Sequence, residues 1–367
     1  MISQRSVWAG LIVSALFLTV FALLFLPFDA VKEVVRAANF WYVIPSLGFY
    51  FLAVYFRSLR WRYLLKPLIG HPRRALYPVV VVGYMANNIL PVRLGEVVRS
   101  YYVGLRESVS PAAAFGTVAV ERVFDVFVLC FVIAAVWVLP VGDLLGRVAD
   151  DLPGGTPVLL VLSVLPFIGV TAIIATIVVL DPGTTVGLIG RLMFFVPAGI
   201  KAKLLGLSER LLEGLTVVRT PRALGAMLLL SLPIWIAEVS MLYVIALGFD
   251  IESAFGSRVE TIAAIGLFMA IANLALVVPS TAGGVGPFNF FGAAMLVALG
   301  VGEAEAGAYV LTAHIALLLP VTLLGLVMLM FDHMSLKTLL GRTRLAREGQ
   351  RDDGLRESAA PPFGPIT

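Results

Sequence analysis

Charged and amide side chains collect in one otherwise apolar stretch of the sequence, residues 83–125. An apolar run breaks there at two asparagines and a proline, a charged turn follows, and the next apolar segment carries three more charges. The polar residues are Asn87, Asn88, Arg93, Glu96, Arg99, Glu121, Arg122 and Asp125. A charged side chain at the centre of a bilayer costs about 2.5–3.5 kcal/mol, so such groups usually face a bundle interior, a cavity or one another. We therefore take this stretch as the candidate site.

The composition places these residues in a membrane protein. Of the 367 residues, 60% are hydrophobic and only 14% are charged, and the mean hydropathy is +0.98. Apolar spans long enough to cross a bilayer recur along the chain. The predicted fold class is an all-α polytopic membrane protein.

Few residues offer metal or disulfide chemistry. The single cysteine, Cys130, lies in an apolar run, where a small buried hydrophobe is the expected role. The three histidines, His71, His314 and His333, lack metal-ligand spacing. We expect no metal site, no cofactor and no nucleic-acid partner.

The pattern of apolar segments predicts about eight crossings and at least one re-entrant half-helix. Residues 76–90 are too short to cross, and broken backbone is tolerated at membrane depth only where protein covers it or a wet cavity adjoins it. A short amphipathic helix at the cytoplasmic interface follows, with Glu96, Arg99 and Arg106 on its polar side. The full spans are expected at about 7–27, from 41 to the basic segment that begins at 57, 112–139, 157–180, 223–247, 261–279, 283–299 and 306–331.

Two further signals refine this map. The pairs Ser110-Pro111, Thr156-Pro157 and Thr220-Pro221 have the form of an N-cap followed by proline at the first helical position. The segment 57–74 carries six basic residues and no acidic one, which is typical of a cytoplasmic boundary. The first span is interpreted as a retained anchor rather than a cleaved signal. Both termini are therefore predicted to be cytoplasmic.

The membrane domain is expected to cover residues 1–335. A cytoplasmic connection at 181–222 has an apolar stripe at helical spacing, and we interpret it as an interfacial joint between two structurally related halves, about 1–180 and 223–335. A plain linker is the alternative. Residues 336–367 are polar and finally proline-rich, so a disordered cytoplasmic tail is expected.

A second break lies at 268–291, where an apolar helix runs into a proline, then glycines, then a polar residue. Paired interruptions in the two halves indicate a transporter site built from discontinuous helices, whose freed N–H groups meet an anionic head group. Ordinary glycine packing in membrane helices is the alternative. The candidate residues from this half are Glu238, Asn273, Gly283, Gly284, Gly286 and Asn289.

Glu238 and His314 are further polar groups within predicted spans. The carboxylate of Glu238 could relay protons or complete an ion pair. We expect His314 to form hydrogen bonds between helices rather than to carry protons.

Three motifs resemble those of a known family. NNILPVRLGEVVRSYYVG, ERVFD and PSTAGGVGPFN are similar to motifs of the flippase-like membrane domain of lysylphosphatidylglycerol synthases, also called uncharacterised protein family 0104. The resemblance reaches to about residue 335, nearly the whole chain. It implies an integral plasma-membrane protein that moves or handles a lipid, or a lipid-linked sugar, between leaflets.

The resemblance also assigns residues by motif position. Asn289 stands where the family pattern has a glutamate, and the sequence shows no synthase domain, so aminoacyl transfer to lipid is not expected. The residues that match are Asn88, Pro91, Arg93, Gly95, Glu96 and Arg99, then Glu121, Arg122 and Asp125, and then Pro279, Gly283, Gly284 and Gly286.

The leading interpretation is a lipid or lipid-linked-sugar translocase whose partners are membrane lipids. In it Arg93, Arg99 and Arg122 attract an anionic or phosphate-bearing head group, because the planar guanidinium binds phosphate in a bidentate way. The alternative for Arg122 is a structural pair with Asp125 or Glu121. For Arg93 and Arg99 the alternative is a role as ordinary interface anchors.

A different class is a membrane glycosyltransferase that acts on a lipid-linked substrate, with Glu96, Glu121 or Asp125 as general base. The sequence has no Gly-rich phosphate loop for a nucleotide sugar. An accessory subunit without transport activity is a third interpretation.

The predicted topology can be tested by thiol labelling in a Cys130→Ser background. Single cysteines at Gly142 or Ser253 should react with an impermeant reagent added from outside, and one at Ser208 should not, because basic residues favour the cytoplasmic side. Labelling at Ser208 in intact cells would contradict the map.

Overall fold

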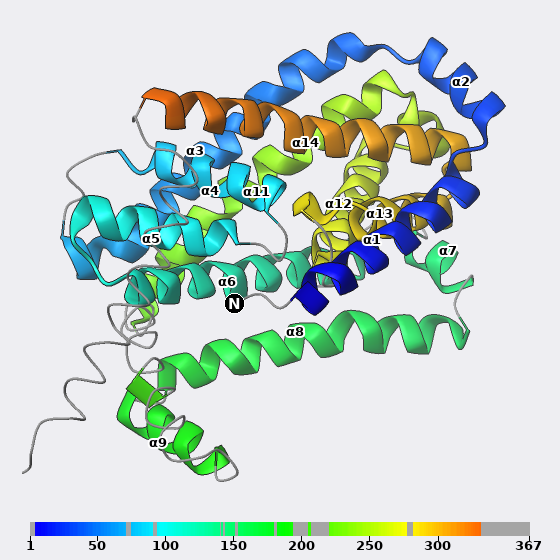
Figure 1. Cartoon of the computed structure of the whole chain (residues 1–367). Helices are drawn as coiled ribbons and strands as arrows, with labels where there is room; N and C mark the ends of the chain where they lie inside the picture. Colours follow the sequence, from blue (N-terminus) through cyan, green and yellow to red (C-terminus); the bar gives the residue numbers. More distant parts are fainter. Residues whose placement is uncertain are drawn as a thin grey trace, which may run out of the picture.

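The structure is a computed structural model that describes residues 4–70, 75–90, 94–139, 141, 144–150, 153–179, 182–193, 205–206, 220–276 and 282–331. The regular elements in these ranges are helices (Figure 1). In chain order they are α1 (Gln4–Phe25), α2 (Phe28–Ala37), η1 (Phe40–Tyr42), α3 (Val43–Ile69), α4 (Tyr77–Ile89), α5 (Gly95–Glu107), α6 (Pro111–Val136), α7 (Leu144–Asp150), α8 (Gly155–Val179), α9 (Pro182–Leu192), α11 (Pro221–Gly248), η4 (Ile251–Ala254), α12 (Arg258–Ala275), η5 (Ala282–Gly284), α13 (Pro287–Ala298) and α14 (Glu303–Phe331).

Five helical stretches among the described residues are long and apolar enough to cross a bilayer, and α1 with α2 makes a sixth if that pair, bent by 81°, is one span. Helix α6 has 26 residues but carries three charges, and α13 has only 12 residues. The structure thus confirms an all-α polytopic membrane protein. The predicted number of about eight crossings requires α6 and the short α13 to cross as well.

The apolar segment at 76–90 forms α4, a helix of only 13 residues. Most of its side chains are fully buried, and it packs against α14 and α5. Gly325 of α14 permits this approach, because a Cβ there would collide with Met85. A helix shorter than the roughly twenty residues of a full crossing and covered by protein is what the sequence predicts for this segment.

Two of the three predicted helix starts have the expected cap. Ser110 Oγ accepts a hydrogen bond from the N–H of Ala113 at 3.5 Å, and Thr220 Oγ1 accepts one from Ala223 at 3.2 Å. Helix α8 instead begins at Gly155, so Thr156 lies inside its first turn. The preceding turn is made by two glycines with positive φ, and a cap at Thr156 is therefore wrong.

The glycine-rich break separates α12 from α13. Gly283, Gly284 and Gly286 have φ of 72°, 71° and 104°, a backbone region that residues other than glycine rarely adopt. Gly286 also lies against the backbone of Ser14 in α1, with no room for a Cβ. Both opened backbone and close packing therefore explain the glycines.

Packing between the other helices holds the two short helices, α4 and α13, inside the bundle. Helix α11 packs most extensively against α3, α13 packs against α12, α14 and α1, and α8 lies on the outside next to α6 (Figure 1). Helix α9 begins the connection at 181–222. Most of that connection, the tail at 336–367, and residues Arg93 and Pro279 lie outside the described residues.

Candidate functional site

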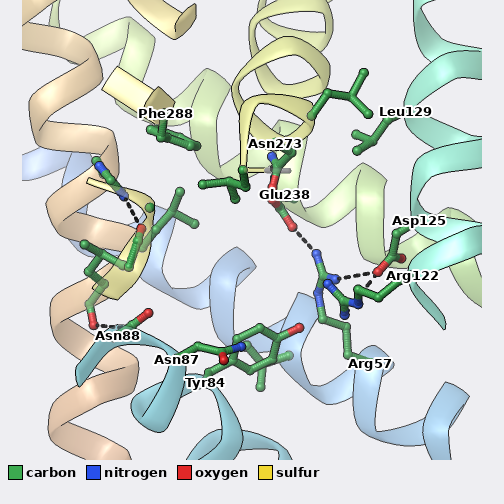
Figure 2. A pocket seen from close by; sticks show the side chains of 18 of the residues that line it. Arg57, Tyr84, Asn87, Asn88, Arg122, Asp125, Leu129, Glu238, Asn273 and Phe288 are labelled. Atoms are coloured by element: carbon green, nitrogen blue, oxygen red, sulfur yellow. Dashed lines mark hydrogen bonds and ion pairs between the residues drawn. The ribbon is translucent and has the colours of Figure 1, made fainter. Parts of the chain in front are cut away.

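A cavity of about 350 Å³ lies between α3, α4, α6, α11, α12 and α14, where the two broken regions meet (Figure 2). Segments that are far apart in the sequence therefore share one wall. Nine residues predicted from the sequence line it: Asn87, Asn88, Glu96, Arg122, Asp125, Glu238, Asn273, Gly283 and Gly284.

Asp125 is the centre of a buried charge network beside this cavity. Its Oδ1 lies 2.8 Å from Arg60 Nη1, and its Oδ2 lies 3.2 Å from Arg122 Nη2 and 3.7 Å from Arg57 Nη1. Arg60 is completely buried and Asp125 nearly so. One carboxylate is thus shared by three guanidinium groups that come from α3 and α6.

The network continues from Asp125 to α11 and α12. Arg57 Nη2 donates to Glu238 Oε2 at 2.5 Å, and the Arg57 guanidinium stands 5.0 Å from the ring centroid of Trp235. Asn273 Nδ2 lies 3.4 Å from the other oxygen of Glu238. Glu238 therefore forms an ion pair, which is one of the two roles expected for it.

A second branch of the network reaches α5. Arg99 donates a charge-assisted hydrogen bond to Glu121, and its guanidinium stands 4.4 Å from the ring centroid of Trp61. Arg60 Nε lies 3.7 Å from the other oxygen of Glu121. Arg122 Nε lies 3.5 Å from Glu96 Oε1 at the more exposed end of the network.

Helix periodicity explains how these groups meet. Arg57 and Arg60 are three residues apart on α3, and Glu121 and Asp125 are four residues apart on α6. Both spacings place the two side chains on one helix face. The two faces carry opposite charges and pack together, so the ion pairs neutralise charges that the low dielectric of the interior would otherwise penalise.

Sequence reasoning missed Arg57 and Arg60 as site residues. It assigned them to a basic cytoplasmic boundary, whereas the structure buries them with exposed fractions of 8% and 0%. The two arginines can be buried because the carboxylates on α6 compensate their charge. Their spacing of three residues, matched by acidic residues on another helix, was the available signal.

Arg99, expected on the interfacial side of α5, lies in the protein interior. Its side chain is buried against α6, where it pairs with Glu121. The other two residues of that side, Glu96 and Arg106, are only partly buried. An ordinary interface-anchor role for Arg99 is therefore excluded, and Arg93 lies outside the described residues.

Three predicted residues, Asn88, Gly286 and Asn289, hold the broken helices in place. Asn88 Nδ2 donates to Leu318 O at 3.1 Å and to Thr322 Oγ1 at 3.0 Å, which joins α4 to α14. Asn289 Oδ1 accepts the N–H of Gly286 at 3.3 Å, behind the cavity wall rather than on it. These contacts favour a positioning role for the three.

His314 bridges the glycine-rich break. Its Nδ1 lies 3.0 Å from Asn289 Oδ1 and its Nε2 lies 3.0 Å from Gly283 O, and its ring stacks on Phe288. This is the interhelical hydrogen bonding that the sequence predicts for it. Among the residues that the structure describes, no three His, Cys, Asp or Glu side chains gather so as to hold a metal ion.

A family of membrane proteins matches most of the chain. Residues 7–325 match the model of the lysylphosphatidylglycerol synthase TM region. The chain belongs to this family.

Curated relatives agree with this membership. The chain is 28% identical over 314 residues to the glycosyltransferase AglD of Haloferax volcanii, a match that covers 78% of this chain and 49% of that protein. It is 31% identical over 125 residues to a UPF0104 membrane protein of Methanocaldococcus jannaschii, covering 33% of this chain and 37% of that one. The chain thus spans about half the length of AglD, and the second match covers a smaller share of its relative. No solved structure matches it.

The charge network predicts unequal costs for two carboxylate-to-amide changes. Asp125→Asn removes the shared partner of three arginines and should lower the free energy of unfolding by about 3–5 kcal/mol. Glu96→Gln, whose partner Arg122 keeps Asp125, should cost about 1 kcal/mol or less. Unfolding of the detergent-solubilised variants measures both, and equal costs would contradict the central role of Asp125.

Proposed function

We propose that this chain is a lipid translocase of the plasma membrane in which the cavity receives the polar head group while the acyl chains stay in the bilayer. The observation that carries the proposal is the meeting of α4 and the α12–α13 break at one polar cavity inside an apolar bundle. Sites made from discontinuous helices are typical of transporters. Multi-pass topology with both termini cytoplasmic is part of the proposal.

The cavity supplies what a crossing head group needs. A polar group that enters hydrocarbon without hydrogen-bond partners costs several kcal/mol, about 2–7 by transfer measurements. Amide groups from Asn87 and Asn273, the ion pair of Arg57 with Glu238, and opened backbone at Gly283 all lie on the wall. These groups replace part of the water that the head group loses. The volume of about 350 Å³ suits a head group rather than a whole lipid.

The same contacts disfavour the glycosyltransferase alternative. A general base needs a lone pair aimed at an acceptor and a suitable protonation state. The three candidate bases, Glu96, Glu121 and Asp125, each face at least one arginine instead. AglD carries the name of a glycosyltransferase, but the match covers only 49% of it. If the folded wild-type protein moves no lipid in liposomes, the accessory-subunit interpretation is the one that remains.

Asn87→Leu tests the role of the cavity. The Asn87 Oδ1 atom is buried on the wall and has no hydrogen-bond partner among the described residues. Leucine there adds apolar volume, so we expect the protein to fold and lipid movement in liposomes to fall by at least about tenfold. A leaflet-access assay with labelled phospholipids and glycolipids measures this rate.

The matched control is Ser240→Leu on the exposed side of α11, where the hydroxyl bonds only to its own helix at Ile236 O. It should move lipids at the wild-type rate. Asn88→Leu is a poorer test, because it also breaks the link of α4 to α14. Unchanged transport in Asn87→Leu would show that the cavity is not on the lipid path.

A further inference from the structure

The arginines on the cavity wall are already occupied. Arg57 pairs with Glu238 and Asp125, and Arg122 pairs with Asp125 and Glu96. A phosphate that binds either guanidinium must compete with these carboxylates, and a buried carboxylate that loses its cation is strongly destabilised.

The net charge of the wall points the same way. The described lining carries two arginines and three carboxylates, so it does not attract an anion by its formal charge. Arg60, Arg99 and Glu121 stand behind the wall, so the whole network has four arginines and four carboxylates. The charge network therefore acts as a neutral scaffold for the cavity.

Five polar atoms of described lining residues are buried without a hydrogen-bond partner. Two of them, Arg122 Nε and Asp125 Oδ2, belong to ion pairs, at 3.5 Å from Glu96 and 3.2 Å from Arg122 Nη2. The other three are neutral. Within the described residues the Tyr84 hydroxyl, Asn87 Oδ1 and Trp235 Nε1 are buried without a hydrogen-bond partner. All three residues line the cavity. Buried Tyr and Trp polar atoms usually find a partner, so these positions indicate a ligand or water that supplies one.

The chemistry of these three atoms fits hydroxyl groups. The indole N–H only donates, the amide oxygen only accepts, and the phenol does both. A hydroxyl group donates and accepts, so several hydroxyls on one ring can satisfy the whole set. The ring of Tyr50 on the same wall can cover a C–H face of such a ring.

We propose that the cavity selects an uncharged, hydroxyl-rich head group, a sugar joined to a lipid, over an anionic one. This inference rests on the proposed translocase function and replaces the anionic head group that the arginine pattern predicts. The arginines hold the helices together, and the neutral groups read the ligand.

Transport of two labelled lipids with identical acyl chains tests the selectivity. The wild-type protein is reconstituted in liposomes with either a monohexosyl-diacylglycerol or phosphatidic acid, and rates are compared with protein-free vesicles. We expect the hexosyl lipid to move at least about tenfold faster. Phosphatidic acid moving as fast or faster overturns the inference and leaves the translocase function standing. Movement of neither lipid overturns the translocase function itself.

Two conservative changes test the atoms. The double variant Tyr84→Phe with Trp235→Phe keeps both aromatic rings and removes only the unpartnered polar atoms. Its preference for the hexosyl lipid over phosphatidic acid, taken as the ratio of the two rates, should fall by about tenfold. A preserved preference in protein of unchanged melting temperature overturns the inference. If the double variant does not fold, Trp235→Phe alone is measured by the same criterion.

Trp137→Phe is the matched control. Trp137 Nε1 is likewise buried without a partner among the described residues, but it lines a separate small cavity between α6, α7 and α8. This variant should keep the wild-type preference. A loss of preference equal to that of the cavity variants would assign the effect to tryptophan loss in general and overturn the inference.

Discussion

The carboxylate of Asp125, held between three arginines, is the interaction on which the rest of the structure depends. It joins α6 to Arg57 and Arg60 of α3, and through Arg57 to Glu238 of α11. Buried charges are tolerated only when they are paired, so these helices have one relative register in which all the pairs form. That constraint fixes the wall against which the short α4 and the glycine-rich break are placed.

The balance of this network also determines what the cavity can bind. Because Arg57 and Arg122 are committed to carboxylates, the protein presents charged residues to its cavity without presenting a free charge. Recognition then falls to uncharged groups such as the Tyr84 hydroxyl. Scaffold and recognition are thus separate functions of neighbouring side chains.

Sequence reasoning found the class and the family, and it grouped residues that the structure brings to one cavity, because polar residues in apolar helices and glycine next to proline are local signals. It placed Asn87 and Gly283 in one site although they are far apart in the chain. It misplaced Arg57, because a basic residue near a helix end has the same local pattern whether it faces water or a buried carboxylate. Only the packing of α3 on α6 distinguishes the two cases.

The roles of Tyr84 and Trp235 were beyond sequence reasoning for a related reason. Aromatic residues are common in membrane helices, and nothing in their spacing shows that a polar atom will lie unpartnered on a cavity wall. The burial of Arg99 was missed because helical spacing defines the two sides of α5 without saying which residue meets a partner on another helix. Arg99 is buried where Glu121 lies opposite it.

Protection of a cavity thiol by lipid tests the central claim most directly. Leu274 lines the cavity, and a cysteine there in a Cys130→Ser background can be titrated with a small thiol reagent in detergent micelles. The account predicts that monohexosyl-diacylglycerol slows the reaction of this thiol and that phosphatidic acid at the same concentration does not. A reaction rate that neither lipid changes, or that phosphatidic acid slows more, would contradict it.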